Sequence, residues 1–482
     1  MARMDGSSIR RLGPVLALAS GLLISGCGSS GGDDDGDESP ATESGDLNFT
    51  PLGPLVEADQ DAPDRLTVVG DDLFFVAEGL SDAVQQVYVT DGTEQGTEAR
   101  TTLESTDGSA TEPHQITPWN EGLYFVTDKA PESTKEDLVA LDAGEPGGVR
   151  VVGEDLIEDI TPQQAEIAIA GDALFVNRDT QSEGRELHKS VDGSDGSLEL
   201  VRDINDDHEE GSEPEDLTSA GDLLYFTADD GEGRTLWVTD GQEGGTKKLV
   251  EIENDNTPSI RRLTAPDGFG DLVFFEAFDE PWVSDGTAAG TEPLVPGSQF
   301  RGRFARLDDS TVLFGDDDQL WTTDGTPGGT EIFADSPGEI LGETAVLDGE
   351  LYFRVGDREV WTTDGTESGT QRVIDMGQSG EFSSRGMPDH FTVYAGRVFF
   401  TADPIGEEGA TGVEDDTRLW ITDGTEAGTN AIEPAEATQA DPADETGHDE
   451  FRLKVHDGAL YLSAEFTEEG RQLWRIDDGS GN

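Results

Sequence analysis

One phrase recurs along the whole chain and limits what the chain can fold into. It reads RLWITDGTEAGT at Arg418–Thr429, and close copies read VYVTDGTEQGT, TLWVTDGQEGGT, EPWVSDGTAAGT, QLWTTDGTPGGT and EVWTTDGTESGT. Two worn copies, DLVALDAGEPGG and ELHKSVDGSDGS, and a cut-off copy at the C-terminus, QLWRIDDGSGN, complete a set of nine. The aspartates of the phrase are Asp91, Asp142, Asp192, Asp240, Asp285, Asp324, Asp364, Asp423 and Asp477, at intervals of 51, 50, 48, 45, 39, 40, 59 and 54 residues. Such a period predicts one supersecondary unit repeated nine times.

The unit itself has the pattern of an antiparallel meander. In Leu217–Val250, four short apolar stretches are separated by Gly-Asp and Asp-Gly turns. The second stretch of most units is a continuous apolar run, such as LVFF at Leu272–Phe275 or VFF at Val398–Phe400, which indicates a strand buried on both faces. Blades of a propeller have this property, and no helical period is visible after the leader. The sequence therefore predicts an all-β fold, a single β-propeller of about nine four-stranded blades, with eight as the alternative.

The ends of the chain suggest how the ring closes. The ninth unit stops directly after its third strand, so its outer strand is missing. The only spare strand-like segment is Leu47–Leu52, upstream of the first inner strand. Because folded proteins avoid open sheet edges, we expect this segment to supply the outermost strand of the blade built from Phe451 to Asp477. Pro51 fits an edge strand, which has one side free of ladder bonds.

The phrase has a local structural interpretation. Its aspartate can accept backbone N–H bonds in the turn, and its glycine supplies positive φ. Leu and Trp of the preceding pair lie on opposite strand faces, one against each adjacent blade. The structural turn aspartates are Asp91, Asp240, Asp285, Asp324, Asp364 and Asp423. A ring of calcium or ligand sites at these turns is the weaker alternative, because a metal site needs several converging oxygens.

Taken together, LWITDGTEAGT, EPWVSDGTAAGT and VWTTDGTESGT, preceded by LYF-type strands, resemble the bacterial ELWxxDGT-repeat proteins, also described as hyalin-repeat-like. The resemblance covers Leu47–Asn482 and departs at Leu138–Gly148 and Glu186–Ser197, where Trp is absent. It implies export and a repeated, propeller-like β fold. It implies neither catalytic residues nor a defined ligand.

The N-terminus has the features of a lipoprotein leader. Three arginines precede a short apolar run at Leu12–Ile24, and Ile24-Ser25-Gly26-Cys27 resembles a bacterial lipobox. Cys27 is the only cysteine, which favours lipidation and excludes an intramolecular disulfide. We expect residues 1–27 to be a signal peptide, 28–46 an acidic disordered tether, and 47–482 the propeller. The protein would then be exported and held at the cell envelope surface by lipid on Cys27.

Net charge restricts the partners. The chain carries 105 acidic and 30 basic residues, a net charge of −75. This charge argues against nucleic acid, whose binding needs basic contacts to phosphate. Only six of the basic residues are lysine, and so acidic a surface is typical of an exported protein from salty surroundings.

Residue patterns for catalysis are missing. No phosphate-binding loop or H-E-x-x-H occurs, and the six histidines are scattered at spacings that do not suggest zinc. The best calcium-like run is Asp203, Asn205 and Asp207, but His208 replaces the required glycine and Pro214 the bidentate acid. We therefore expect no cofactor, with calcium as an open alternative.

Loop lengths point to one face of the ring. The long stretches are Asp128–Asp137, Arg178–Glu186, Asp203–Asp216, Met376–His390, Asp403–Thr417 and Glu433–Glu450. All connect the second strand to the third or one blade to the next, and such loops emerge on the same face, which in repeat proteins usually carries binding. They can also be tolerated acidic insertions. The sequence favours a non-enzymatic scaffold that binds protein or glycan, with a propeller-type enzyme acting at its central channel or a structural envelope component as alternatives.

Overall fold

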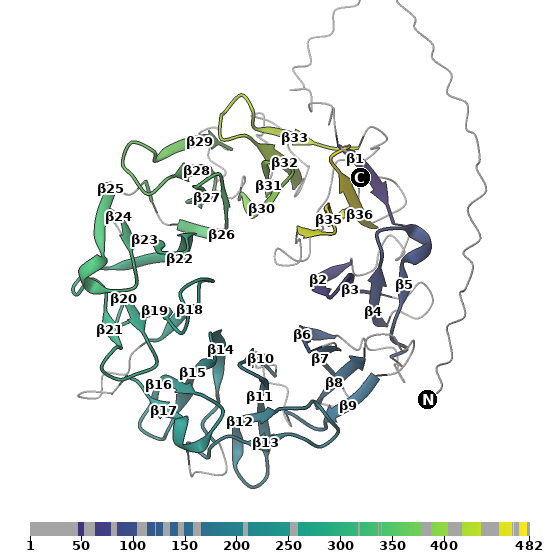
Figure 1. Cartoon of the computed structure of the whole chain (residues 1–482), viewed down its shortest axis with the longest axis vertical. Coiled ribbons are helices and arrows are strands. Elements are labelled where there is room, and N and C mark those ends of the chain that lie inside the picture. The colour runs from purple at the N-terminus through teal and green to yellow at the C-terminus, as the bar shows by residue number, and fades with distance from the viewer. Residues whose placement is uncertain are drawn as a thin grey trace, which may run out of the picture. The chain divides into compact units, whose positions relative to one another are not determined.

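The computed structural model describes residues 47–52, 63–78, 84–103, 113–120, 122–128, 135–142, 149–157, 165–205, 211–250, 259–316, 319–335, 337–338, 340–376, 387–402, 417–434, 453–464, 466 and 472–479. Internal contacts divide the chain into Met1–Pro40 and Ala41–Asn482, and all described residues belong to the second unit. In this unit nine four-stranded antiparallel sheets follow one another around a ring (Figure 1). The predicted leader and tether, 1–46, lie outside the described residues.

Each sheet is a blade, and in blades 1 to 8 the strands run from the centre of the ring outward in chain order. The inner strands of blades 1 to 9 are β2 (Asp64–Val69), β6 (His114–Trp119), β10 (Ile167–Ala170), β14 (Glu215–Ala220), β18 (Arg261–Thr264), β22 (Phe300–Asp308), β26 (Ile340–Leu347), β30 (Asp389–Tyr394) and β34 (Lys454–His456). The second strands are β3 (Asp72–Glu78), β7 (Gly122–Asp128), β11 (Ala173–Thr180), β15 (Leu223–Asp229), β19 (Val273–Ala277), β23 (Thr311–Asp316), β27 (Glu350–Val355), β31 (Arg397–Ala402) and β35 (Ala459–Ala464).

The third strands carry the repeated Leu-Trp pair. They are β4 (Gln85–Thr90), β8 (Glu136–Asp142), β12 (Gly184–Ser190), β16 (Arg234–Thr239), β20 (Glu280–Ser284), β24 (Gln319–Thr323), β28 (Glu359–Thr363), β32 (Arg418–Thr422) and β36 (Gln472–Asp477). The outer strands are β5 (Glu98–Ala99), β9 (Val149–Gly153), β13 (Glu199–Leu200), β17 (Lys247–Lys248), β21 (Glu292–Pro293), β25 (Glu331–Asp335), β29 (Gln371–Asp375), β33 (Asn430–Ile432) and, in blade 9, β1 (Asn48–Pro51).

Blade 9 is completed by the N-terminal segment, as the sequence predicts. β1 pairs antiparallel with β36, with Asn48 opposite Asp477 and Pro51 opposite Trp474. The N–H of Leu52 extends the ladder with a 2.9 Å bond to the carbonyl of Leu473. The edge of β36 is therefore covered, and the ring closes with nine blades; the eight-bladed alternative is wrong.

Nine apolar clusters hold the ring together, one between each pair of neighbouring blades. The cluster between blades 3 and 4 shows the common arrangement: Leu187 of blade 3 meets Trp237 of blade 4, with Phe175 and Phe226 beside them. The same pairing joins Leu419 to Trp474 across blades 8 and 9. The Leu and Trp of the phrase thus contact opposite neighbours, and the prediction for this pair is confirmed.

One detail differs from the sequence-based expectation. Arg178–Glu186 is not a long loop, because β11 and β12 stay paired until Thr180 opposite Gly184, leaving a tight hairpin. The two worn copies of the phrase, in blades 2 and 3, form complete four-stranded sheets, as the prediction of nine blades requires. In blade 2, Trp119 of the inner strand is buried and packs on Tyr124, which adds aromatic volume to the cluster between blades 2 and 3.

Helical structure is confined to short turns in the part of the chain described. Three 3-10 turns occur there, η1 (Glu94–Gly96), η2 (Glu243–Gly245) and η3 (Pro327–Gly329), each inside a copy of the phrase. Within the same residues, no helix is long and apolar enough to cross a membrane.

Candidate functional site on the loop face of the ring

The turns of the phrase lie on the face opposite the long loops, and their polar groups bond within each turn. In blade 7, Oδ1 of Asp364 accepts hydrogen bonds from the N–H of Thr366 at 2.9 Å and from its hydroxyl at 2.6 Å. The same hydroxyl oxygen accepts the N–H of Gly369 at 3.1 Å. Asp91, Asp285, Asp324 and Asp423 make the same bonds, and Asp240 accepts the N–H of Gln242.

The two glycines of the phrase are needed for different reasons. Gly365 has φ +81, and a Cβ on it would lie 3.0 Å from Leu307 of the preceding blade, so this turn also forms part of the joint between blades. A Cβ on Gly369 would lie 2.0 Å from Oδ1 of Asp364. The bonds from Thr425 hold the pKa of the equivalent Asp423 below its ordinary value. The repeated residues of the phrase therefore build the turn and pack it against the neighbouring blade.

The residue just before the Leu-Trp position accepts a backbone hydrogen bond from the segment that crosses to the next blade. Oε1 of Gln86 accepts the N–H of Leu103, and Oδ1 of Asp137 accepts the N–H of Asp155, both at 2.8 Å. In blade 5, Oε1 of Glu280 accepts the N–H of Gly297 at 2.7 Å. The partners are 17 or 18 residues along the chain, which is why a local sequence reading did not assign this position a role.

The loop face contains a second repeated feature, at the start of the inner strands. Five blades begin with a short polar motif in which the second residue has positive φ: Asp64-Arg65-Leu66-Thr67, His114-Gln115-Ile116-Thr117, Glu215-Asp216-Leu217-Thr218, Arg261-Arg262-Leu263-Thr264 and Asp389-His390-Phe391-Thr392. A register shift accompanies each motif. In every one the threonine hydroxyl donates to the carbonyl of the positive-φ residue, at 2.9 to 3.2 Å. Blades 6 and 7 have Gly302 and Gly342, also with positive φ, at the corresponding bulge.

This motif places polar residues at the centre of the ring. Its apolar third residue packs into the clusters between blades, whereas Gln115, Asp216 and Arg262 are exposed. The sequence analysis did not identify this motif. Its signal is the recurrence of two polar residues, an apolar residue and a threonine a few residues before a Gly-Asp-type turn. Non-glycine residues with positive φ mark strained backbone that often clusters at functional sites. We call the starts of the nine inner strands the mouth.

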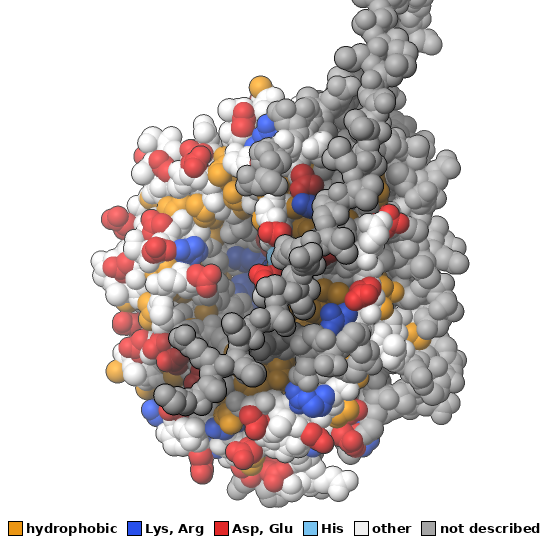
Figure 2. All heavy atoms as spheres, turned by 45° about the vertical axis from the view of Figure 1, so that its right-hand side comes forward, with side chains coloured by type: hydrophobic (Ala, Val, Ile, Leu, Met, Phe, Trp, Pro, Cys, Tyr) orange, Lys and Arg blue, Asp and Glu red, His pale blue; other side chains and the backbone are white. Residues whose placement is uncertain are grey.

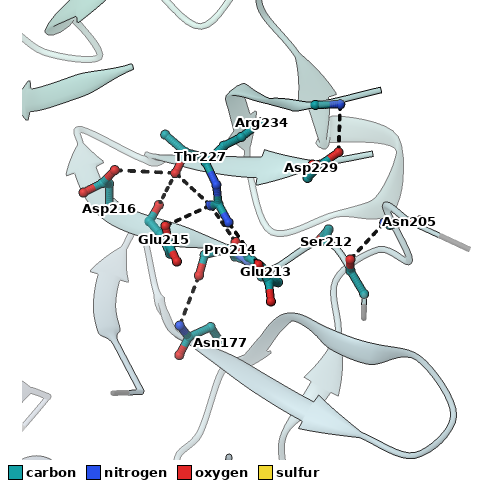
Figure 3. A network of polar contacts seen from close by, with 12 residues as sticks. Asn177, Asn205, Ser212, Glu213, Pro214, Glu215, Asp216, Thr227, Asp229 and Arg234 are labelled. Carbon is teal, nitrogen blue, oxygen red and sulfur yellow. Dashed lines mark hydrogen bonds and ion pairs between the residues drawn. The ribbon is translucent and has the colours of Figure 1, made fainter. Parts of the chain in front are cut away.

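The mouth between blades 3 and 4 is mainly acidic. Nη1 of Arg234 donates to the carbonyl of Glu213 at 2.8 Å and lies 3.1 Å from Oε2 of Glu215 (Figure 3). Asn177 of blade 3 donates to the carbonyl of Pro214 at 3.1 Å, which joins the two blades. Glu213 and Asp216 both have positive φ, so the segment that enters β14 is bent sharply around this arginine.

Glu186, which is buried, and Glu166, which is half-buried, lie beside that network. Oε1 of Glu186 accepts the N–H groups of Asn205 and Ser212, and Oε2 accepts the hydroxyl of Ser212 at 2.6 Å. Burial raises the pKa of Glu186 to about 7, although these hydrogen bonds act to lower it. Partial burial also raises the pKa of Glu166, which accepts the N–H of Leu217 from blade 4.

The inner strands differ in charge from the rest of the chain. They carry seven basic residues, Arg65, Arg261, Arg262, Arg301, Arg303, Arg306 and Lys454, and six acidic ones, Asp64, Glu215, Asp216, Asp308, Glu343 and Asp389. In the whole chain acids outnumber bases by 105 to 30. Figure 2 shows the ring obliquely, with basic side chains in blue both near its middle and at its rim, among more numerous acidic side chains in red.

The remaining sequence-based site residues are not brought together. Asn205 donates its side-chain amide to the carbonyl of Gly211 at 2.9 Å, and Asp203 lies near enough to Glu186 to raise its pKa further. Asp207 and Cys27 lie outside the described residues. Among the residues that the structure describes, no group of three or more His, Cys, Asp or Glu side chains could hold a metal ion. His114 lies 3.4 Å from Glu136, and His390 bonds to Thr401 at 2.9 Å, each within its own blade.

The fold and its polar mouth define a nine-bladed β-propeller. No protein-family model matches the chain, and no curated protein does either. Among solved structures, the chain is similar to the computationally designed Ika8 protein at 16% identity, over 72% of this chain and 96% of that one, with a TM-score of 0.39. It is also similar to the tricorn protease at 14% identity, over 85% of this chain and 47% of that one, with a TM-score of 0.31. The similarity to puromycin hydrolase is at 16% identity, over 75% of this chain and 62% of that one, with a TM-score of 0.35. At these identities and TM-scores, no activity or partner is transferred from those proteins to this chain.

Proposed function

We propose that this protein is a binding scaffold of the cell envelope whose ligand, a protein or a glycan, docks on the loop face at the mouth. The proposal includes membership of the ELWxxDGT-repeat proteins, lipidation at Cys27 and adaptation to high salt, all of which the sequence patterns favour.

The observation that carries the binding proposal is the mouth itself. Five strained, polar strand starts place exposed Gln115, Asp216 and Arg262 around the centre of one face. Propellers commonly place ligands where their blades converge, and polar groups on a rigid sheet scaffold are well positioned for recognition.

Binding accounts for the titratable groups better than catalysis does. Glu186 and Glu166 have raised pKa values, which is a feature of catalytic acids. However, Glu186 accepts backbone N–H bonds from the crossover to blade 4, and Glu166 accepts one from Leu217. Their carboxylates are thus engaged in joining blades, and a reacting substrate would have to displace those bonds.

A site-blocking experiment tests the proposal. Residues 28–482 would be prepared without the leader, so that the chain lacks Cys27 and accepts a single engineered cysteine. Gln115→Cys places a bulky maleimide label at the mouth, and Glu331→Cys places the same label at an exposed position on the outer strand β25. Binding to a glycan array and to immobilised envelope fractions is then measured in molar potassium chloride.

We expect the label at residue 115 to abolish binding and the label at residue 331 to leave it intact. Equal loss with both labels would place the docking site elsewhere. If the unlabelled chain retains neither a glycan nor an envelope protein, that result would contradict the scaffold function itself.

A further inference from the structure

Blade 5 breaks the repeat at the mouth. The Trp of the third strand pairs with one residue of the second strand, for example Trp282 with Phe275 in blade 5. The next residue of the second strand lies opposite the start of the inner strand. In the other eight blades this residue is Val76, Val126, Asn177, Thr227, Gly315, Arg354, Thr401 or Ser463. In blade 5 it is Glu276, the one carboxylate in the set, and the residue opposite it is Arg261.

The charges of blade 5 are also reversed. At the first position of the mouth motif, blades 1, 4 and 8 have the acids Asp64, Glu215 and Asp389, whereas blade 5 has Arg261 followed by Arg262. No other copy of the motif has two basic residues. This replacement of acidic by basic residues in one copy of an otherwise regular repeat indicates a role specific to blade 5.

Glu276 fixes the position of both guanidinium groups. Its side chain is only 3% exposed; Oε1 lies 2.8 Å from Nη2 of Arg261, and Oε2 accepts a hydrogen bond from Nη1 of Arg262. A buried carboxylate is stable only when it is paired and hydrogen-bonded, so these ion pairs are firmly held. Arg262 also lies over the ring of Phe300, with its guanidinium carbon 5.9 Å from the ring centroid. The two guanidinium groups are thus preorganised beside one another.

Most of their donor capacity remains available. A guanidinium has five N–H donors, and these contacts use one terminal nitrogen of each arginine. The side chains of Arg261 and Arg262 are 50% and 38% exposed. Asp279 is the second acid on Arg261, at 3.1 Å, but it is 70% exposed and therefore strongly screened by water. One buried carboxylate does not neutralise two arginines. Arg303 lies on β22 of the neighbouring blade 6, three residues after Phe300, and is exposed with no ion pair among the described residues.

The surroundings decide what kind of anion can approach. A net charge of −75 repels long polyanions, because most of their charges would lie over acidic surface. A single carboxylate or sulfate group can instead enter the local excess of positive charge, and salt shortens the range of the repulsion. Protein partners usually need exposed apolar anchors. Among the described residues the exposed large apolar side chains are Val191, Ile332, Met387 and Val455, on four different blades.

We infer that Arg261 and Arg262, held by Glu276, form a clamp for the carboxylate or sulfate group of an acidic saccharide, with Arg303 as a third cation at its edge. The inference rests on the proposed binding function of the mouth and names its ligand class. Arginine suits this role because its planar fork matches the geometry of an oxyanion. The neutral hydroxyl groups of the saccharide would meet the other polar residues of the mouth.

The test is calorimetric titration of the full mature chain with trigalacturonate, neutral galactotriose and inorganic sulfate, in low salt and in molar potassium chloride. We expect trigalacturonate to bind and galactotriose to bind at least about tenfold more weakly, since one charge-assisted hydrogen bond is worth about that much. Arg262→Gln should weaken trigalacturonate binding by about tenfold or more, and Arg262→Lys, which keeps the charge but not the fork, by less. Arg303→Gln, which breaks no ion pair of the described fold, should weaken it severalfold.

The matched control is Arg372→Gln. Arg372 lies on β29 of blade 7, is 50% exposed and forms a surface ion pair with Glu359, so its removal changes the net charge equally without touching the mouth. We expect no change in binding for this variant. Equal effects of Arg303→Gln and Arg372→Gln, or failure of trigalacturonate to bind, would overturn the clamp. Binding of sulfate alone would overturn the saccharide as ligand. If envelope ligands still dock at the mouth while these titrations fail, only this inference fails and the scaffold function stands.

Discussion

Replacement of Glu186 by Gln should change how stability depends on pH. The folded protein raises the pKa of this carboxyl from its ordinary 4.5 to about 7, chiefly by burial. Between those values the folded chain keeps a proton that the unfolded chain has released. The free energy of unfolding therefore falls as pH rises through this range. At 1.36 kcal/mol per pH unit, the loss contributed by Glu186 is about 3 kcal/mol, complete by about pH 8.

The glutamine variant removes this loss while keeping the local bonds. Its Oε1 can still accept the N–H groups of Asn205 and Ser212, and the Ser212 hydroxyl can reverse its role to accept from the new amide. We expect the variant to match the parent protein near pH 5. Near pH 8 it should be more stable by about 3 kcal/mol, because the parent must then hold a buried charge.

Urea denaturation at a series of pH values, in constant molar potassium chloride, measures the difference. Glu331→Gln serves as the control, since it changes net charge equally at an exposed position on β25. A stability difference between parent and Glu186→Gln that is the same at pH 5 and pH 8 would refute the reasoning.

Three further predictions concern the phrase, the charge and the leader. Asp364→Ala removes the acceptor for both bonds from Thr366 and should cost about 1–2 kcal/mol of unfolding free energy; strong stabilisation of the parent by calcium that disappears in this variant would instead favour a metal role. The melting temperature should rise between dilute buffer and molar potassium chloride, because salt screens the self-repulsion of 105 acids; a flat or falling profile would contradict adaptation to salt. Cys27→Ser should abolish incorporation of labelled fatty acid and leave an uncleaved or soluble form, so equal labelling of the variant would refute the lipobox.

Much of the fold could be predicted because its determinants are local and repeated. Nine copies of the phrase gave the number of blades, and the missing last strand of the ninth copy pointed to Leu47–Leu52. The hairpin at Arg178–Glu186 was misjudged because its charged residues look like loop, although they pair across β11 and β12. Ladder bonds in a sheet do not depend on side-chain polarity, so polar composition alone does not identify a loop.

The mouth was harder to predict. Its bends occur at residues such as Arg65, Asp216 and His390, which carry no glycine marker for positive φ. The bond of Glu186 to the crossover and the capture of Glu276 by two arginines depend on which strands become neighbours, not on sequence spacing. Only the folded ring shows that blade 5 reverses the charge arrangement of its neighbours.

The direction of β1 determines how an anchored ring would be presented. Asn48 lies opposite Asp477, the turn aspartate of blade 9, so the chain enters the ring on the face of the DGT turns. If lipid is attached at Cys27, as proposed, and if the 19 residues between it and Leu47 form the flexible tether that the sequence predicts, the typical end-to-end distance of that tether would be only about 25 Å. The turn face would then lie nearer the bilayer, and the mouth with its arginine clamp would open outward to the medium. Closing the last blade with the N-terminal strand would thus also determine which face of the ring is exposed to the external medium.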